Sequence, residues 1–290
     1  SFCRTEKHCF KHEAASWEIK KWILTEIGDE DKTKVRFYET DVSFVKPAFG
    51  PSWYIVSDGW QGSYYYEDSH DIAERPGVYL FPDYYTAIVG LFRDHVLVTG
   101  HVTRLSEACR DGHVWSLSFD PIARSSPPLT YSPPSHYSFG VSPTSGDPYE
   151  MRTVEVKRSA KEDANQGLFT KRSVMSGEVL AFYSGLIINC DSSLRPLDRR
   201  ELTDEEEHKR NAYNIALDLG GEEENLCIDI PPDMGGNVSK YSATLAHKVN
   251  HSFEPNSEFV LFSAHPVLGT IMAITALEDM EAGLEITVNY

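Results

Sequence analysis

One short stretch of the sequence, residues 247–256 (HKVNHSFEPN), concentrates side chains that can do chemistry. It places two histidines, two asparagines, a serine and a proline between apolar segments. A strand that only covers a hydrophobic core has no need of so many hydrogen-bonding groups. The stretch is therefore either a turn-rich structural knot or a site, and we infer that it is both.

The spacing of the histidines first raises the question of a metal. His247 and His251 stand at i and i+4, so two imidazoles on one helical face could bind an ion. A hydrolytic zinc site would also need a glutamate between them and a third ligand, whereas Lys248 and Asn250 stand there and the lysine charge opposes a cation. Four residues near the N-terminus also lack paired metal-ligand spacing: Cys3, His8, Cys9 and His12. We therefore expect no metal site.

The composition is that of a folded, acidic protein. Of 290 residues, 41% are hydrophobic and 24% are charged, a balance typical of globular proteins. Apolar runs such as residues 86–92 are too short to span a bilayer, so we expect a soluble protein with no transmembrane segment. The 27 basic and 44 acidic residues give a net charge of −17, which argues against direct nucleic-acid binding and favours cationic partners such as lysine-rich protein tails. Acidity that serves solubility alone remains an alternative.

The cysteines and the ends of the chain bear on its compartment and completeness. The five cysteines are odd in number and mostly far apart, which predicts reduced thiols in an intracellular compartment. They are Cys3, Cys9, Cys109, Cys190 and Cys227. The sequence starts at Ser1 rather than at a methionine, so we expect a piece of a longer protein, and a removed signal remains open.

The chain is predicted to contain an N-terminal segment followed by two mainly β regions. Residues 1–49, of unknown function, are predicted to hold one helix. Four apolar residues fall on one face of this helix: Ile19, Trp22, Ile23 and Ile27. Ser16 is the candidate N-cap, and Gly28 is expected to end the helix. Residues 50–105 show short aromatic and β-branched runs between turns, the pattern of an antiparallel β-meander of hairpins. Residues 106–150 are predicted to be a proline-rich connector with strands that lead into the next domain. The boundary between the connector and that domain is expected near Tyr149. Residues 151–290 are predicted to be mostly strands.

The hairpin region resembles MORN repeats, whose pattern is an aromatic residue, a glycine, a second aromatic residue and a charged turn. The positions that carry the resemblance are Tyr85, Gly90, Phe92, Asp94 and Gly100. His95 stands where the usual turn has a glycine, so the repeat is degenerate. A generic β-meander is the alternative.

The second half resembles the SET-domain protein lysine methyltransferases through three blocks in the family's order and spacing. The opening block is NQGLFTKRSVMSGEVLAFYSG (residues 165–185), the middle block is NHSFEPN (residues 250–256), and the closing block is LEITVNY (residues 284–290). DPYE and VSKYSATLAHKVNHSF, together with the hairpin region, are most similar to MORN-repeat-containing histone-lysine methyltransferases. The resemblance covers roughly residues 50–290 and is strongest from Asp147 onward.

This resemblance implies a fold of small β-sheets with a C-terminal pseudoknot, in which Asn250 and Tyr290 come together. It implies S-adenosylmethionine as cofactor and transfer of its methyl group to a lysine. The implied cofactor-binding residues are Ala164, Gln166, Asn214, Asn250 and His251. The implied catalytic residues are Tyr290 beside the reacting amine and Tyr183 in the wall of the lysine channel. His247 is then expected to be structural.

The chemistry explains why such residue types belong together. A lysine with a pKa near 10.4 is charged at pH 7, and making it a neutral nucleophile corresponds to about 4 to 5 kcal/mol of differential interaction. A narrow aromatic channel with little water disfavours the ammonium, while hydroxyl and carbonyl oxygens direct the lone pair. Tyrosines supply both functions.

Two departures from the family pattern matter. Phe259 occupies a channel position where close relatives keep a tyrosine, and the missing hydroxyl leaves room for a methylated amine to rotate. We therefore expect Phe259 to allow more than monomethylation. The chain also stops at Tyr290, without the segment that relatives pack over the cofactor, which again predicts a truncated sequence, or else a protein that has lost activity.

The function that these observations favour is an S-adenosylmethionine-dependent protein lysine N-methyltransferase acting on histone tails or other basic nuclear proteins, with a role in chromatin regulation. The alternative is a non-catalytic scaffold whose acidic SET-like surface and MORN-like sheet bind other proteins. We expect a monomer in the nucleus, and a cytoplasmic pool remains open. The sequence does not identify the target lysine.

Overall fold

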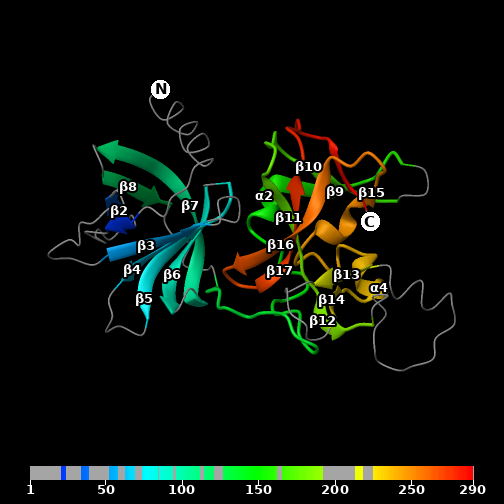
Figure 1. The fold of residues 1–290 in the computed structure, drawn as a ribbon, viewed down its shortest axis with the longest axis horizontal. Helices are drawn as coiled ribbons and strands as arrows, with labels where there is room; N and C mark the ends of the chain where they lie inside the picture. The colour runs from blue at the N-terminus through cyan, green and yellow to red at the C-terminus, as the bar shows by residue number, and fades with distance from the viewer. Residues whose placement is uncertain are drawn as a thin grey trace. The chain divides into compact units, whose positions relative to one another are not determined.

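The computed structural model describes residues 21–23, 34–38, 52–57, 63–68, 74–83, 85–93, 96–111, 114–120, 127–161, 165–191, 213–217 and 225–289. The chain divides into two compact units, Ser1–Tyr131 and Ser132–Tyr290 (Figure 1). Both units are built mainly from strands, as the sequence predicts. In the part of the chain that is described, no helix has the length and apolar character needed to cross a membrane.

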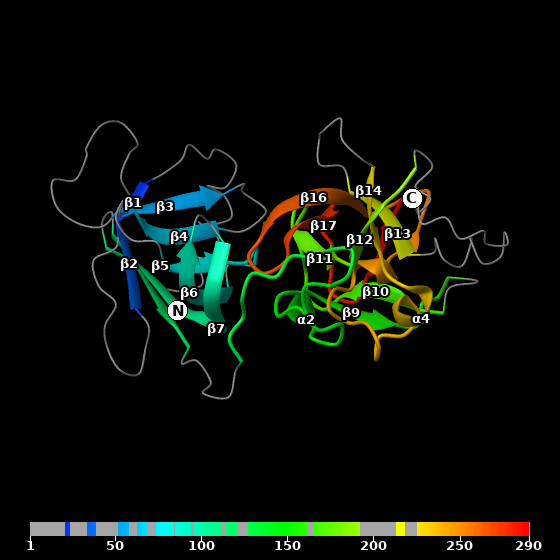
Figure 2. The same ribbon diagram turned by 90° about the horizontal axis from the view of Figure 1, so that it is seen from below.

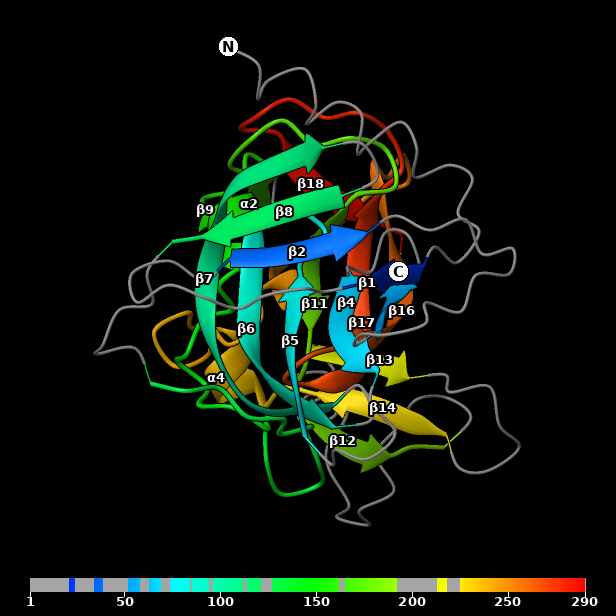
Figure 3. The ribbon, with the colours of Figure 1, turned by 90° about the vertical axis from the view of Figure 1, so that its left-hand side faces the viewer.

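The first unit is one eight-stranded sheet with the order β1-β3-β4-β5-β6-β7-β8-β2. Its strands are β1 (Lys21–Ile23), β2 (Lys34–Tyr38), β3 (Ser52–Ser57), β4 (Ser63–Asp68), β5 (Arg75–Leu80), β6 (Thr86–Arg93), β7 (Val96–Asp111) and β8 (Val114–Phe119). From β3 to β8 each strand pairs antiparallel with the next, which is a meander. The backbones of β1 and β2, at the two ends of this order, also come close, so the sheet curls on itself (Figure 3).

Apolar and aromatic side chains of the central strands form the core of this unit. Those with almost no exposed surface are Val78, Tyr79, Leu80, Phe81, Ile88, Phe92, Leu97 and Phe119. The turn between β5 and β6 is fixed by Asp83, whose carboxylate accepts hydrogen bonds from the backbone N–H of Tyr85 at 2.9 Å and of Thr86 at 2.8 Å. A short acidic side chain that bonds its own backbone in this way stabilises a tight turn, so the sequence sets the β5–β6 register locally.

Three glycines lie in one row across the sheet. Gly77 is directly opposite Gly90, and Gly90 is directly opposite Gly100. A side-chain carbon added at Gly90 would lie 2.2 Å from the carbonyl oxygen of Thr99, so no larger residue fits this position. Gly90 and Gly100 are two of the positions that resemble MORN repeats, and the row explains physically why glycine stands there. The MORN assignment itself remains a prediction.

Two expectations for this unit are wrong. The predicted N-terminal helix is contradicted at Lys21–Ile23, which form β1 and pair with β3, while the rest of that helix lies outside the described residues. Trp22 and Ile23 suit a strand at least as well as a helix, and pairing with a neighbour decides between these weak preferences. The predicted connector over 106–150 begins too early, because β7 and β8 continue the sheet to Phe119 and the first unit ends at Tyr131. Its proline-rich composition starts only at Pro121.

The second unit holds three small sheets around one core (Figure 2). The sheets have the orders β15-β18-β10-β9, β11-β17-β16 and β12-β14-β13. Their strands are β9 (Val154–Lys157), β10 (Gly167–Thr170), β11 (Val179–Tyr183), β12 (Leu186–Asn189), β13 (Asn214–Leu217), β14 (Leu226–Asp229), β15 (Asn250–His251), β16 (Ser257–His265), β17 (Gly269–Ala276) and β18 (Glu285–Val288). Among the described residues of this unit, three short helices accompany them: α2 (Glu150–Thr153), α4 (Pro232–Gly235) and the 3-10 helix η2 (Ala246–Lys248).

The core of the second unit collects side chains from all three sheets. Its fully buried members include Leu168, Leu180, Ile228, Tyr241, Ala246, Ile274, Ile286 and Val288. In the sheets β15-β18-β10-β9 and β12-β14-β13 no strand is longer than four residues, so these two sheets depend on packing against the rest of the unit for stability. The elements that carry the candidate site are consequently fixed by packing from several directions.

We predict that Gly90→Ala destabilises the first unit. The added methyl group must displace the backbone at Thr99, and such overpacking costs about 1 to 3 kcal/mol in the free energy of unfolding. Chemical unfolding of the two variants Gly90→Ala and Val96→Ala measures the effect, because Val96 lies on the partner strand β7 and is 36% exposed. Equal unfolding midpoints for the two variants would show that the glycine row imposes no steric constraint.

Candidate functional site

The three sequence blocks meet in one sheet. β18, from the closing block, lies between β15 of the middle block and β10 of the opening block. β15 runs parallel to β18, with Asn250 opposite Thr287 and His251 opposite Val288. β10 is antiparallel to β18, with Leu168 opposite Ile286. Segments that are far apart in the sequence are therefore neighbours, which is the adjacency that the predicted pseudoknot requires.

The carboxylate of Glu285 joins these segments through hydrogen bonds. The side-chain amide of Asn250 donates to Glu285 Oε1 at 2.7 Å and to the carbonyl oxygen of Gln166 at 3.0 Å. Ser159 Oγ lies 2.8 Å from Oε1 and 3.0 Å from Oε2 of the same carboxylate. A side-chain carbon at Gly167 would lie 2.4 Å from Glu285 Oε1, so the glycine leaves room for this cluster.

This cluster changes what Asn250 can do. Both N–H groups of its side chain are used within the protein, so the side chain fixes the loop at Gln166 against β18. Any hydrogen bond that the Asn250 side chain makes to a cofactor must then use its Oδ1 atom. Sequence reasoning missed Glu285 and Ser159. Glu285 belongs to the closing block, so its position in that motif could have suggested a role. Ser159 lies outside all three blocks, and no sequence motif indicates its role.

Asn256, at the end of the middle block, also binds the closing block. Its Oδ1 accepts a hydrogen bond from the backbone N–H of Thr287 at 2.8 Å, and its Nδ2 donates to the carbonyl oxygen of Glu285 at 2.9 Å. Ser257 Oγ donates to the carbonyl oxygen of Thr287 at 2.7 Å. An asparagine that bonds backbone in both directions continues the sheet where β15 has ended, so these residues extend the contact between the two blocks.

His251 lies at the outer side of this arrangement. Its ring stands edge-on to the ring of Phe253, with centroids 4.8 Å apart, and Phe253 is 91% exposed. Its carbonyl oxygen accepts a hydrogen bond from Lys161 Nζ at 2.6 Å. The imidazole is half-buried, so it is accessible to a bound molecule in a way that His247 is not.

The predicted channel residues Tyr183 and Phe259 come together. Tyr183 ends β11 and is 4% exposed, and Phe259 lies half-buried in β16. Their ring centroids are 6.1 Å apart with an interplanar angle of 68°. Edge-to-face packing of this kind fixes both rings. The hydroxyl of Tyr183 is the one polar group of the two side chains.

His247 lies behind Tyr183 in a pocket of tyrosine rings. Its ring centroid is 6.4 Å from that of Tyr183, 5.9 Å from that of Tyr213 and 5.2 Å from that of Tyr241. Burial lowers the pKa of His247 to about 3, and the neighbouring charge of Lys248 acts in the same direction. The imidazole is therefore neutral near pH 7, and its buried position agrees with the structural role expected for it.

Lys248 is a buried cation at the same place. It is 7% exposed, its Nζ donates to Gln166 Oε1 at 3.0 Å, and it lies 6.0 Å from the centroid of the Tyr213 ring. Burial lowers the pKa of Lys248. No ion pair of Lys248 is found among the described residues. Across the same ranges of the chain, no group of three histidines, cysteines or acidic residues could hold a metal ion.

Asn214 begins β13, in a different sheet from Asn250. The residue before it, Tyr213, has its ring beside Lys248 Nζ, and this contact brings the start of β13 close to Lys248. Its Nδ2 lies 3.9 Å from Cys190 Sγ. The remaining two predicted site residues, Tyr290 and Ala164, lie outside the described residues.

Cys190 and Cys227 form a disulfide, so the expectation of reduced thiols is wrong for this pair. They are 37 residues apart in sequence, but antiparallel pairing of β12 with β14 brings their Cα atoms to 6.2 Å. This separation is in the usual range for a bridge. Sequence spacing could not reveal the pair, because the strand register creates it.

Comparison with known proteins identifies the domain that contains the site. The SET domain family model matches residues 165–290. The histone-lysine N-methyltransferase SETD7 of Halocynthia roretzi is 29% identical to the chain over 228 residues, which are 77% of this chain and 53% of that protein. The variant-silencing SET domain-containing protein of Plasmodium falciparum (isolate 3D7) is 27% identical over 144 residues, 48% of this chain and 5% of that protein. The chain thus contains a SET domain and is homologous to SETD7.

Among solved structures, ctPRC2 in an autoinhibited conformation bound to S-adenosylmethionine matches with a TM-score of 0.35 and 23% sequence identity, over 48% of this chain and 15% of that chain. The chain spans about half the length of SETD7 and 5% of the Plasmodium protein.

We predict that His247 makes the second unit less stable in acid. Its folded pKa of about 3 is below the ordinary value of 6.5, so between these pH values the unfolded chain binds a proton that the folded chain does not. Stability from this group is complete above pH 6.5 and is lost as the pH falls toward 3. His247→Phe removes this contribution, so its free energy of unfolding should fall less steeply with acid, by more than about 1 kcal/mol over the interval.

Urea unfolding at pH 7.0 and at pH 4.5 measures this difference. His136→Phe is the control, because His136 lies in an exposed turn and the same substitution there should leave the acid dependence of the wild type. Burial raises the pKa of Glu150 and gives an opposite pH dependence in all three proteins, so it cancels from the comparison. Identical acid dependence in His247→Phe and the wild type would contradict the assignment of a neutral buried imidazole.

Proposed function

Because residues 165–290 contain a SET domain, we propose that this protein is an S-adenosylmethionine-dependent protein lysine N-methyltransferase. The observation that carries the proposal is the meeting of the three blocks around β18, with Asn250 held between Gln166 and Glu285. A purely structural sheet would not require a buried cation, a half-exposed histidine and a tyrosine in an apolar wall at the same place. SET methyltransferases use S-adenosylmethionine, whose sulfonium group supplies the methyl.

The residues present suit that cofactor. It carries a carboxylate in its methionyl part, and the buried ammonium of Lys248 offers a charge of the complementary sign. The residues that would hold the cofactor are Ala164, Gln166, Asn214, Asn250 and His251, with Lys248 added. Gly167, which lacks a side chain beside Glu285, allows the backbone of the opening block to approach closely.

The residues of the chain contribute to the reaction by binding the lysine and by disfavouring its charged form. An ammonium that lies against the packed rings of Tyr183 and Phe259 loses water, which lowers its pKa toward that of a neutral nucleophile. The hydroxyl of Tyr183 can accept the remaining N–H and direct the lone pair. Tyr290 is proposed to stand beside the reacting amine, since it comes two residues after the end of β18 in the sequence and β18 runs alongside Asn250 and His251. The proton leaves the lysine to solvent before the methyl is transferred.

The substrate class follows from charge and homology. A net charge of −17 favours encounter with lysine-rich segments, and the homologue SETD7 is named as a histone-lysine N-methyltransferase. We therefore propose histone tails or other basic nuclear proteins as substrates, action as a monomer, and a location in the nucleus. The first unit, as a MORN-like sheet, would be an accessory domain.

We predict that the chain binds S-adenosylmethionine and transfers its methyl group to lysine. Titration calorimetry with S-adenosylmethionine, and transfer of a labelled methyl group to core histones, test the two steps with the whole protein. Tyr290→Phe should lower the transfer rate by about 100-fold, because the hydroxyl beside the amine is lost, while the cofactor still binds. His251→Ala should mainly weaken cofactor binding.

Circular dichroism on each variant controls for loss of the fold. Absence of heat on titration with S-adenosylmethionine would overturn the proposal and favour the non-catalytic scaffold. Cofactor binding without transfer to any histone would instead contradict only the substrate class, which a panel of basic nuclear proteins then tests.

We also predict that the product is more than monomethyl-lysine. Phe259 has no hydroxyl, so the wall beside Tyr183 leaves space for a methylated amine to rotate and react again. Phe259→Tyr should shift the product toward monomethyl-lysine, and mass spectrometry of a reacted peptide at long times measures it. Phe169→Tyr adds the same hydroxyl at a half-buried position of β10 and should leave the product distribution unchanged. Wild-type protein that yields only monomethyl product would contradict the role of Phe259.

A further inference from the structure

The segment DPYE, residues 147–150, forms a buried polar cluster next to β11, and the proposed reaction does not use it. Asp147 is 7% exposed and Glu150 is 1% exposed. Two buried carboxyl groups three residues apart are costly unless hydrogen bonds compensate each of them. Their partners therefore indicate what the segment does.

Glu150 connects two backbone segments that carry site residues. One oxygen of its carboxyl, Oε1, accepts hydrogen bonds from the backbone N–H of Phe182 and from that of Leu245, the latter at 3.1 Å. Phe182 immediately precedes Tyr183 in β11. Leu245 immediately precedes η2, which contains His247. The bond to Phe182 is buried and the bond to Leu245 is partly buried, so loss of the shared acceptor would cost both segments a hydrogen bond away from bulk water.

The segment that contains Tyr183 and the segment that contains His247 also contact each other directly. The ring of His247 packs edge-on against the ring of Tyr183. Thr244 Oγ1 accepts the backbone N–H of Ser184 at 3.0 Å. The Glu150 carboxyl therefore holds the residue before Tyr183, the Thr244 hydroxyl holds the residue after it, and the ring of His247 contacts its side chain.

Glu150 is itself held rigidly. Asp147 Oδ1 accepts the backbone N–H groups of Tyr149 at 2.9 Å and of Glu150 at 3.0 Å. Asp147 Oδ2 lies 3.2 Å from His265 Nε2. His265 Nδ1 accepts the N–H groups of Val267 and Leu268, so the ring proton is on Nε2 and is donated to Asp147. The segment is thus anchored to the β16–β17 turn.

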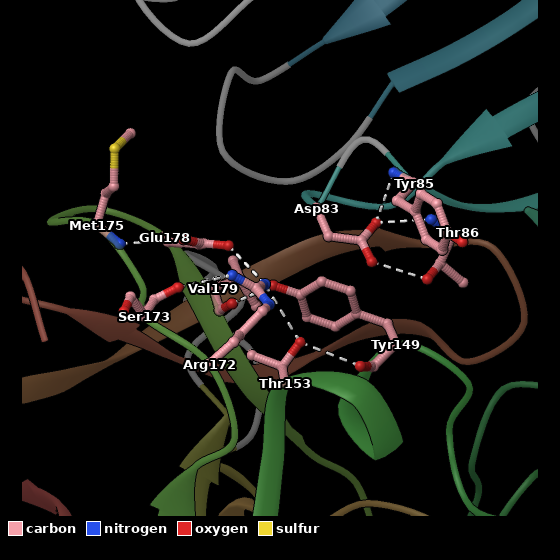
Figure 4. A network of polar contacts seen from close by, with 10 residues as sticks. All are labelled: Asp83, Tyr85, Thr86, Tyr149, Thr153, Arg172, Ser173, Met175, Glu178 and Val179. Atoms are coloured by element: carbon pink, nitrogen blue, oxygen red, sulfur yellow. Dashed lines mark hydrogen bonds and ion pairs between the residues drawn. The ribbon is translucent and has the colours of Figure 1, made fainter. Parts of the chain in front are cut away.

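Tyr149 adds a second attachment to β11. Its hydroxyl donates to the carbonyl oxygen of Val179, at the start of that strand (Figure 4). Its ring also packs against that of Phe182. Figure 4 also shows Arg172 between Glu178 and Thr153, at distances of 2.6 Å and 3.4 Å, which joins the start of β11 to α2. β11 is therefore attached at both ends, and Glu150 is the attachment next to Tyr183.

We propose that Glu150 is a positioning residue for methyl transfer: by holding the N–H groups of Phe182 and Leu245 on one carboxyl oxygen, it fixes Tyr183 against His247 in the wall of the lysine channel. This inference rests on the proposed function. Burial raises the pKa of Glu150, with the charge of Asp147 as a further cause. What the N–H groups of Phe182 and Leu245 need from this residue is an acceptor oxygen. An amide oxygen can replace such an acceptor, whereas a methyl group cannot.

The test compares Glu150→Gln with Glu150→Ala in the whole protein, with a fluorine label on the ring of Tyr183. Glu150→Gln should keep the fluorine resonance of the wild type and a kcat within about threefold, since its Oε1 accepts both N–H groups. Glu150→Ala should move or split the resonance and lower kcat about 10- to 100-fold, with KM for S-adenosylmethionine changed less than threefold, because a small misplacement of a channel group mainly affects the transition state. Glu150→Asp, which is one methylene shorter and reaches only one of the two N–H groups, carries the same expectation if Glu150→Ala does not fold.

Thr153→Val is the matched control for stability. Thr153 Oγ1 donates to the carbonyl oxygen of Tyr149 and accepts from Arg172, which lies at the start of β11. Neither bond involves Phe182 or Leu245, so the loss of this hydroxyl weakens α2 and its link to the start of β11 without releasing Tyr183 at the other end of the strand. An equal fall of kcat in Thr153→Val and Glu150→Ala would overturn the proposal, as would an unmoved fluorine resonance in Glu150→Ala.

The fluorine measurement needs no substrate, so the two proposals fail separately. A displaced resonance in Glu150→Ala with no transfer by the wild type would support the positioning of Tyr183 and contradict only the reaction. Transfer by the wild type that Glu150→Ala retains in full would support the reaction and overturn the positioning role.

Discussion

The carboxylate of Glu285 is the interaction on which the second unit depends. It receives Asn250 from the middle block and Ser159 from the loop after β9, and Gly167 of the opening block leaves the room that it occupies. A carboxylate that is half-buried and bonded in this way is strongly directional, because charge-assisted hydrogen bonds are short and weaken when bent. The positions of Gln166, Asn250 and β18 relative to one another are therefore set by one side chain, and the other residues of the candidate site are arranged around it.

The electrostatics of the site follow from the contrast between two adjacent residues. His247 is neutral inside a ring of tyrosines, whereas Lys248 keeps a buried ammonium beside Gln166. The lysine charge disfavours protonation of the histidine, so the pair holds one positive charge rather than two. That charge is on the side of the opening block, where an anionic group of a ligand can balance it, and the side of Tyr183 and Phe259 stays apolar.

The sequence allowed the mainly β architecture, the two-part division and the grouping of the three blocks to be predicted, because strand periodicity and short motifs are local signals. It did not allow β1 to be recognised, since three residues with mixed preferences are decided by the strand beside them. Strand register creates the Cys190–Cys227 bridge, and the paths of loops decide the roles of Ser159, Lys161 and Glu150. The residues next to these positions in the sequence determine neither the register nor the loop paths. Tyr183 with Phe259 was predictable as a pair only through the family resemblance, and the ring distances then place them together.

The distance in sequence between the bonded groups has a consequence for how the second unit forms. Ser159 and Glu285 are separated by 126 residues, and β15 and β18 lie in parallel, an arrangement that no hairpin can nucleate. Closing so long a loop costs entropy before any contact compensates it, so this sheet must assemble late and slowly compared with the meander of the first unit, whose strands pair with their immediate neighbours. During synthesis, the loop at Gln166 and the strand at Asn250 leave the ribosome before the residue that unites them. The hydrogen bonds to Glu285 are thus absent from every nascent chain that has not yet reached this residue.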